Sequence, residues 1–275
     1  MIKLRFLSLG AGVQSTTMAL MAARREIGPM PDCAIFADTG WEPAGVYRHL
    51  DWLETQLPFP VYRVSAGNIR DDLLARRTER SGNFITVPFF LKHANGKEGI
   101  GRRQCTSHYK VEPIRKKTRE LLGVGPRDRI PAGSVEKWIG ISVDEIIRAR
   151  LSSVKFETHR FPLLESRMRR VDCLQWLRDR QYHIPSKSSC IGCPFHSNAM
   201  WREMRDSDPE AWAEACQVDA EIREPIGREF RRAEMRGQQF MHARRVPLAE
   251  VDLSTAEDRG QLNLFINDCE GMCGL

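Results

Sequence analysis

The sequence predicts an α/β protein with a doubly wound, mainly parallel sheet and a helical, cysteine-bearing cap at its C-terminal end. Apolar runs that suit buried strands alternate with helical patterns over roughly the first hundred residues. Polar turns follow the first two runs, as expected where parallel strands end at one edge of a sheet. After residue 185 the chain becomes charged and helical and carries a Cys-x-x-Cys motif. We therefore divide the chain into an α/β domain, 1–185, and a C-terminal region, 186–275.

The first strand, residues 4–9, ends in a turn of small residues, and helix formers follow from Ser15. Gly10 and Gly12 allow a backbone approach that a Cβ would block. Such a turn directs several N–H groups and the positive end of a helix at one spot, where nucleotide phosphates bind. A glycine pair after a strand is also ordinary turn geometry, so the motif alone leaves both interpretations open. The nucleotide-binding residues predicted here are Ser8, Gly10, Ala11, Gly12, Gln14, Ser15 and Thr16.

The next elements complete a βαβ unit. A second buried strand lies within 31–38, a helix follows Pro43, and a third strand covers 61–65. Because ligands of such sheets bind beyond the carboxyl ends of the strands, residues 10–16 and 38–42 should lie close together. Asp38 is then either a ribose or magnesium partner or a helix cap. Thr39 and Gly40 are predicted to bind nucleotide with it.

Composition sets limits on the class of protein. The chain has 275 residues, 41% of them hydrophobic, enough for one sizeable core. Its formal charge of +6 favours polyanions such as nucleotides or nucleic acid. No apolar run has the length that a bilayer requires and the start lacks a secretory signal, so we expect a cytoplasmic protein without a membrane partner.

Eight cysteines without an export signal argue against a disulfide framework and favour metal or redox chemistry. Cys33, Cys173 and Cys216 lie in apolar or helical patterns that indicate inert residues. The Cys-x-x-Cys motif at 190–193 has the spacing that one metal centre needs, although such a motif is also found in dithiols. The five metal-ligand candidates are Cys105, Cys190, Cys193, Cys269 and Cys273.

Two motifs taken together resemble a known family. Gly10-Ala-Gly-Val-Gln-Ser15, with Phe36-Ala-Asp-Thr-Gly-Trp-Glu-Pro43 and Tyr47, resembles the phosphoadenylyl-sulfate (PAPS) reductase family, within the adenine nucleotide α-hydrolase (PP-loop ATP pyrophosphatase) superfamily. The resemblance continues through Trp138-Ile-Gly-Ile-Ser-Val-Asp-Glu145 and Arg148, which look like the strand and arginine-bearing loop facing the nucleotide.

This resemblance implies a set of site residues. Gly140 and Ser142 would contact an adenine nucleotide, either ATP or a sulfonucleotide (PAPS or adenylyl sulfate, APS), with Mg²⁺. The implied catalytic residues are Ser15, Asp38, Asp144, Arg148 and Cys273. Gln14 replaces the aspartate of the ATP pyrophosphatases, as in reductase-like members. Ser142 stands where the reductases usually show an arginine.

The cysteines extend the resemblance to iron–sulfur members of the family. Gln104-Cys-Thr-Ser-His-Tyr-Lys-Val-Glu-Pro-Ile114 resembles the cysteine-pair segment of iron–sulfur adenylyl-sulfate reductases, with Thr106 in place of the second cysteine. Together with the motif at 190–193 it implies a [4Fe–4S] cluster in preference to zinc or a dithiol. The fourth ligand is left open among His196, Cys269 and Cys273.

Three hypotheses for function follow. The favoured one is ATP cleavage at the α-phosphate, giving AMP and pyrophosphate, in sulfur-transfer or nucleic-acid-modification chemistry. The second is reduction of PAPS or APS to sulfite by a thiolate of Cys273 or Cys269, with a thioredoxin-like reductant as partner. The third is a non-catalytic accessory protein that binds nucleotide, or binds nucleic acid through the basic segment 92–119, which otherwise forms a solvated surface. A homodimer is also considered.

Overall fold

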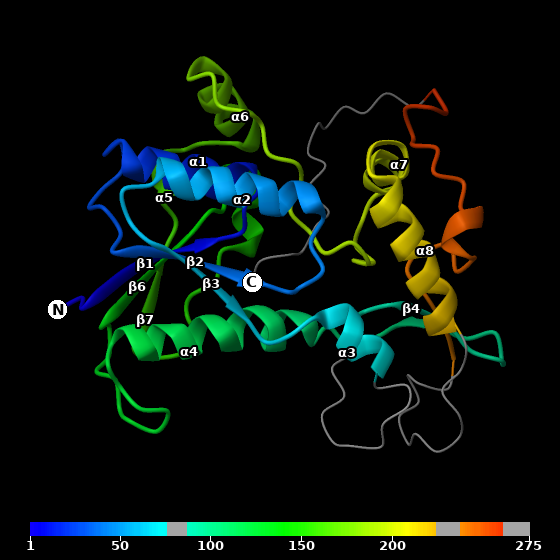
Figure 1. Ribbon diagram of the computed structural model, residues 1–275, viewed down its shortest axis with the longest axis horizontal. Coiled ribbons are helices and arrows are strands. Elements are labelled where there is room, and N and C mark those ends of the chain that lie inside the picture. Colours follow the sequence, from blue (N-terminus) through cyan, green and yellow to red (C-terminus); the bar gives the residue numbers. More distant parts are fainter. Residues whose placement is uncertain (76–86, 224–236, 261–275) are drawn as a thin grey trace.

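The computed structural model describes residues 1–75, 87–223 and 237–260. Its central sheet has five parallel strands in the order β3-β2-β1-β6-β7 (Figure 1). The strand order reverses between β1 and β6, because β2 and β3 lie on one side of β1 while β6 and β7 lie on the other. The predicted doubly wound parallel sheet is confirmed. The strands are β1 Leu4–Leu9, β2 Cys33–Asp38, β3 Val61–Ser65, β6 Val135–Ile139 and β7 Glu157–Arg160.

Helices cover both faces of this sheet, which explains why β1 and β2 are mainly apolar. Figure 1 shows α1, α2, α5 and α6 on one face and α4 on the other. Along β1, Leu7 packs into the core on the α1 side, while Phe6 packs with Ile114 of α4 on the opposite side. Cys33 and Cys173 are buried as predicted, and burial raises the pKa of each thiol to about 12. These helices are α1 Val13–Ala23, α2 Ala44–Gln56, α4 Glu112–Leu121, α5 Pro162–Glu165 and α6 Arg170–Asp179.

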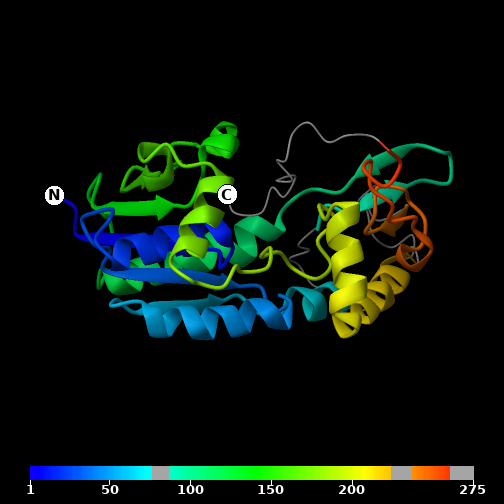
Figure 2. The same ribbon diagram turned by 90° about the horizontal axis from the view of Figure 1, so that it is seen from above.

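A second core lies at the other end of the molecule (Figure 2). A small antiparallel sheet, in the order β5-β4-β8, joins residues of the basic segment to the C-terminal region. The buried Trp201, Tyr109 and Phe89 form the centre of this core. The elements are α3 Ile69–Ala75, β4 Phe90–Lys92, β5 Glu98–Ile100, α7 Asn198–Ser207, α8 Pro209–Arg223, β8 Gln238–Phe240 and a 3-10 turn, Leu248–Glu250.

The first part of the basic segment 92–119, which the sequence left open between a nucleic-acid contact and a solvated surface, contributes to a β-hairpin of β4 and β5. Because β4 pairs with β8, the second core draws on chain from both sides of residue 185. The boundary between 185 and 186 stays a prediction. No helix in the described part of the chain is long and apolar enough to cross a membrane.

Candidate functional site

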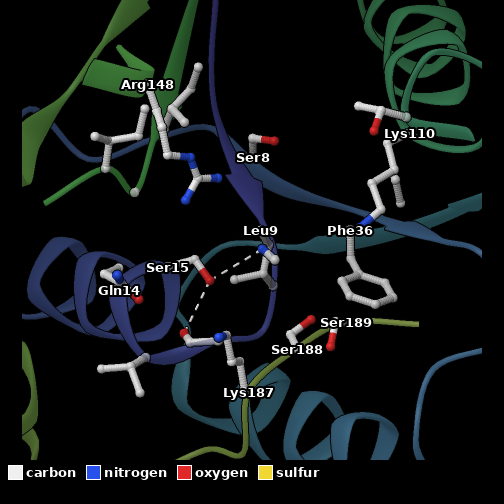
Figure 3. Close-up of a pocket in the computed structure, with 18 of the residues that line it drawn as sticks. Ser8, Leu9, Gln14, Ser15, Phe36, Lys110, Arg148, Lys187, Ser188 and Ser189 are labelled. Atoms are coloured by element: carbon white, nitrogen blue, oxygen red, sulfur yellow. Dashed lines mark hydrogen bonds between the residues drawn. The ribbon is translucent and has the colours of Figure 1, made fainter. Parts of the chain in front are cut away.

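A pocket opens at the carboxyl ends of β1 and β6, where the strand order reverses (Figure 3). Its walls come from the turn after β1, the ends of β2 and β6, and two short helical turns, η1 (Ser107–Val111) and η2 (Val143–Arg148). The segment 187–200 closes the remaining side. This is the crevice in which open α/β sheets bind their ligands.

The turn after β1 presents the N-terminus of α1 to this pocket. Gly12 is the N-cap of α1, and neither a side-chain cap nor an acidic residue occupies its first turn. The Oγ of Ser15 accepts from the Gly10 N–H at 3.2 Å and donates to the Gly12 carbonyl at 3.2 Å. Ala11 holds a left-handed φ of +57°, a conformation that costs a non-glycine residue about 1–2 kcal/mol. The turn is therefore preorganised, and the first turn of α1 faces the pocket.

Three glycines around this turn have different structural requirements. A Cβ on Gly140 would lie 3.1 Å from the N and Cα atoms of Ser15, so the end of β6 needs glycine to approach the turn. A Cβ on Gly10 or Gly12 would meet no protein atom closer than 3.7 Å or 3.8 Å. The predicted need for glycine at 10 and 12 would therefore come from a ligand and not from the fold.

The pocket has an excess of positive charge. Five cationic side chains line it, against the two carboxylates of Glu42 and Glu145. Arg148 donates from its guanidinium to Glu145 Oε1 at 2.7 Å. Figure 3 shows Arg148 and Lys110 reaching into the pocket from opposite sides. The five cations are Lys110, Lys137, Arg148, Arg170 and Lys187. An anionic ligand fits this environment.

Asp144 and Ser142, both predicted site residues, connect the loops behind the pocket. Asp144 accepts the hydroxyl of Ser142 and, at 3.0 Å, the backbone N–H of Arg170. Gln14 Nε2 lies 3.5 Å from Ser142 Oγ. Asp144 and Ser142 are thus brought close to the turn after β1, but neither lines the pocket. Their contacts fit the positioning of loops.

Asp38 lies at the end of β2, as predicted, and its carboxylate accepts hydrogen bonds from the protein itself. Its Oδ1 accepts the N–H of Gly40 and the hydroxyl of Tyr47, each at 2.8 Å. Burial is the largest cause of the raised pKa of Tyr47, and the hydrogen bond to Asp38 is the second. Asp38, Thr39 and Gly40 do not line the pocket, so the structure does not bring these three predicted residues to it.

Glu42 reaches the pocket from this turn instead. Its side chain is 4% exposed, and its Oε1 accepts the Thr39 hydroxyl at 3.2 Å. Its Oε2 is buried without a hydrogen-bond partner among the described residues. Sequence reasoning missed this residue although it belongs to the quoted motif 36–43.

Thr16, predicted to bind nucleotide, faces away from the pocket into the contact between α1 and α2. Its hydroxyl lies 2.8 Å from His49 Nε2, and His49 Nδ1 lies 2.6 Å from Nε2 of the exposed His183. Burial lowers the pKa of His49 to about 4. The imidazole is therefore neutral at pH 7, and nothing in the sequence pattern indicated this pair.

The Cys-x-x-Cys motif forms a tight turn beside Glu42. The Cys193 N–H donates to the Cys190 carbonyl at 3.0 Å, and Cys190 Sγ lies 3.2 Å from Thr39 Oγ1. A Cβ on Gly192 would lie 2.1 Å from the Trp41 ring, so this turn requires glycine. His196, a candidate fourth ligand, pairs with Ser189 Oγ at 2.7 Å, and burial lowers its pKa to about 3.

These residues do not complete a cluster site by themselves. Across 1–75, 87–223 and 237–260, no three His, Cys, Asp or Glu side chains converge as metal ligands. Cys190 and Cys193 offer two ligands from one turn, and Cys105 packs against the second core. Cys269 and Cys273 lie outside the described residues. We derive no chemical step through a [4Fe–4S] cluster.

The basic segment 92–119 does not form a single cationic surface. Lys110 lines the pocket, whereas Lys117 pairs with Glu120 at 2.7 Å and lies over the Tyr62 ring. Arg119 donates to the carbonyl of Gly125. Lys117 and Arg119 thus make their contacts within the protein.

Comparison with known proteins finds similarity in structure alone. No family model matches the sequence, and no curated protein matches it. The PAPS reductase from Candida auris, solved as a phosphate complex, is similar with a TM-score of 0.43 at 10% identity, over 68% of this chain and 80% of the reductase. The reductase is of the family that the motifs resemble.

A second similar structure is the U34-tRNA thiolase NcsA from Methanococcus maripaludis with its [4Fe-4S] cluster. Its TM-score is 0.39 at 12% identity, over 80% of this chain and 72% of the thiolase. At these scores the two structures carry no functional assignment. The proposed function rests on the residues of the pocket and on the sequence motifs.

Proposed function

We propose that the chain binds an adenine nucleotide with its phosphates on the turn 10–15, and that it cleaves ATP between the α- and β-phosphates. Water takes the adenylyl group, which gives AMP and pyrophosphate. The observation that carries the proposal is the uncapped N-terminus of α1, facing a pocket with five cations and two carboxylates at the point where the strand order reverses. The choice of adenine, and of the bond that is cleaved, follows from the motif resemblance.

The groups that line or support the pocket would each contribute to this reaction. Backbone N–H groups of the first turn of α1 would hold the phosphates, as helix N-termini do. Arg148 and Lys187 line the same pocket and would offset the charge that develops on the leaving pyrophosphate. Asp144 accepts hydrogen bonds from Ser142 and from the Arg170 N–H, and these would hold the turn that carries Arg148 in place beside the turn 10–15.

Magnesium fits this pocket at one carboxylate. The buried, unpartnered Oε2 of Glu42 is an oxygen ligand of the kind that Mg²⁺ takes from proteins when phosphates supply others. Bound there, the ion would withdraw negative charge from the phosphate oxygens. Glu42 would hold it, and the Thr39 hydroxyl on Oε1 would fix the orientation of the carboxylate.

The test is product analysis on anaerobically purified protein. ATP labelled at the α-phosphate is incubated with Mg²⁺, and in parallel APS and PAPS are incubated with a dithiol; AMP, pyrophosphate, sulfite and bound iron are measured. Formation of AMP and pyrophosphate, strongly reduced in Arg148→Met and retained in the control variant Lys155→Met at an exposed position, supports ATP cleavage. Sulfite formed from APS or PAPS, with no AMP formed from ATP, would replace the proposal with sulfonucleotide reduction. Nucleotide binding without any product would favour the accessory protein.

A further inference from the structure

Lys137 occupies an unusual place in the middle of a buried strand. It lies on β6, where its register partners are Phe6 of β1 and His159 of β7. Phe6 belongs to the apolar core between the sheet and α4, whereas His159 and Glu157 of β7 make the other side of Lys137 polar. A lysine placed there costs desolvation unless its ammonium finds hydrogen-bond acceptors.

The pocket reaches this lysine through an inner compartment between the sheet and α4. We define the compartment by the pocket-lining residues on that face of the fold. Its members are Ser8, Ala37, Val111, Ile114, Lys137 and Ile139. Four of the six are aliphatic, and the compartment lies beside the turn 10–15 that faces the phosphates. A mainly aliphatic compartment that adjoins a phosphate site suits a heteroaromatic ring.

Within the described residues, no hydrogen bond or ion pair engages the Lys137 ammonium. Burial lowers its pKa, while the carboxylate of Glu157 opposes this. Glu157 Oε1 accepts from His159 Nε2 at 2.9 Å, its Oε2 is buried without a hydrogen-bond partner, and the residue does not line the pocket. Since no hydrogen bond joins the Lys137 ammonium to Glu157 in this structure, its N–H donors are available to a ligand in the compartment.

We propose that Lys137 is the specificity residue for the nucleobase, donating a hydrogen bond to a ring nitrogen of adenine held in the inner compartment. The inference rests on the proposed nucleotide site and identifies the side chain that would recognise the base. Adenine provides ring-nitrogen acceptors at N1, N3 and N7, and lysine is a donor only. The aliphatic side chains would supply contact area, and the hydrogen bond from Lys137 would distinguish adenine from bases without an acceptor at that position.

The experiment compares ATP with its 1-deaza, 3-deaza and 7-deaza analogues, and with tripolyphosphate, in calorimetric titrations of wild type, Lys137→Met and Lys155→Met. Methionine keeps most of the length of the side chain and removes the donor, and thermal melting checks that the variant folds. We expect one deaza analogue to bind wild type about 10-fold more weakly than ATP, since a hydrogen bond to a charged donor has roughly that effect. Lys137→Met should bind ATP as weakly as that analogue and lose the discrimination. The control Lys155→Met should keep it.

Each other outcome has one meaning. Equal ATP affinity in wild type and folded Lys137→Met, or a deaza effect that persists in the variant, would overturn the assignment of Lys137. An equal loss of tripolyphosphate affinity in Lys137→Met would also overturn it, because it makes Lys137 a phosphate contact. Failure of wild type to bind either ATP or tripolyphosphate would instead contradict the proposed nucleotide site itself.

Discussion

Gly140→Ala separates the fit of the phosphate turn from the stability of the fold. The added Cβ would lie 3.1 Å from Ser15 N and Cα and 3.3 Å from the Gln14 carbonyl carbon. Ordinary contacts begin at 3.4 Å, so the shortest of these is 0.3 Å too close. All three atoms are backbone and cannot rotate away. The first turn of α1 must therefore shift, by a few tenths of an ångström.

Overpacking of this size costs about 1–2 kcal/mol of unfolding free energy, which corresponds to a melting temperature lower by roughly 2–6 °C. The loss of nucleotide affinity should be larger, about 10-fold or more, because the displaced N–H groups are those assigned to the phosphates. Calorimetric titration with ATP and thermal melting measure the two effects. Gly99→Ala is the matched control, since its Cβ would meet only the Leu91 side chain at 3.9 Å. A folded Gly140→Ala protein that binds ATP like wild type would refute the reasoning.

Four further predictions follow from the same geometry. Gly12→Ala should leave the melting temperature within about 1 °C of wild type and still weaken ATP binding, since only a ligand needs the space; equal affinity would contradict this. Arg148→Met should lower kcat/KM for ATP about 10²-fold, the size of effect seen for one charge-stabilising group. Arg167→Met, at an exposed position just after α5 that does not line the pocket, should leave kcat/KM unchanged. Glu42→Gln should raise the Mg²⁺ concentration needed for half-maximal turnover, and an unchanged requirement would remove Glu42 as the magnesium ligand. For His49, the folded pKa of about 4 lies below the ordinary 6.5, so the unfolded chain takes up the proton first as the pH falls. The free energy of unfolding should therefore decline from about pH 6.5 to pH 4, by up to about 3 kcal/mol, and denaturant titrations should show less decline in His49→Gln.

Much of the fold follows from local patterns. The runs that became β1 and β2 are mainly apolar because helices cover both faces of the sheet at these strands, whereas the edge strand β3 is more polar. The turn 10–15 could be predicted because strand, small residues and helix follow one another directly in the sequence. The hairpin β4–β5 could not, since two strands of three residues show no alternation and depend on pairing with the distant β8.

Residues of contiguous motifs lie close together in the structure, because each motif ends a neighbouring strand. Gln14 lines the pocket and lies 3.5 Å from Ser142, which donates to Asp144. The resemblance implied that Ser142 contacts nucleotide and that Asp144 is catalytic, whereas neither residue lines the pocket. Asp38 illustrates the limit: an acidic residue after a strand suits either a ligand or its own turn, and in the structure it accepts from Gly40 and Tyr47.

Other pocket residues depend on long-range packing. Lys137 and Lys187 reach the pocket from a central strand and a late loop, and in sequence they resemble any other charged residue. No local pattern distinguishes a lysine that faces a ligand from one that faces solvent.

The central claim is that nucleotide phosphates bind at the N-terminus of α1. The most direct measurement is a crystal structure of the full chain with α,β-methylene ATP, which the proposed cleavage cannot hydrolyse. We predict triphosphate density within hydrogen-bond distance of backbone N–H groups of the turn 10–15, with Arg148 and Lys187 against its oxygens. Phosphates bound elsewhere, at full occupancy and with this turn empty, would contradict the account.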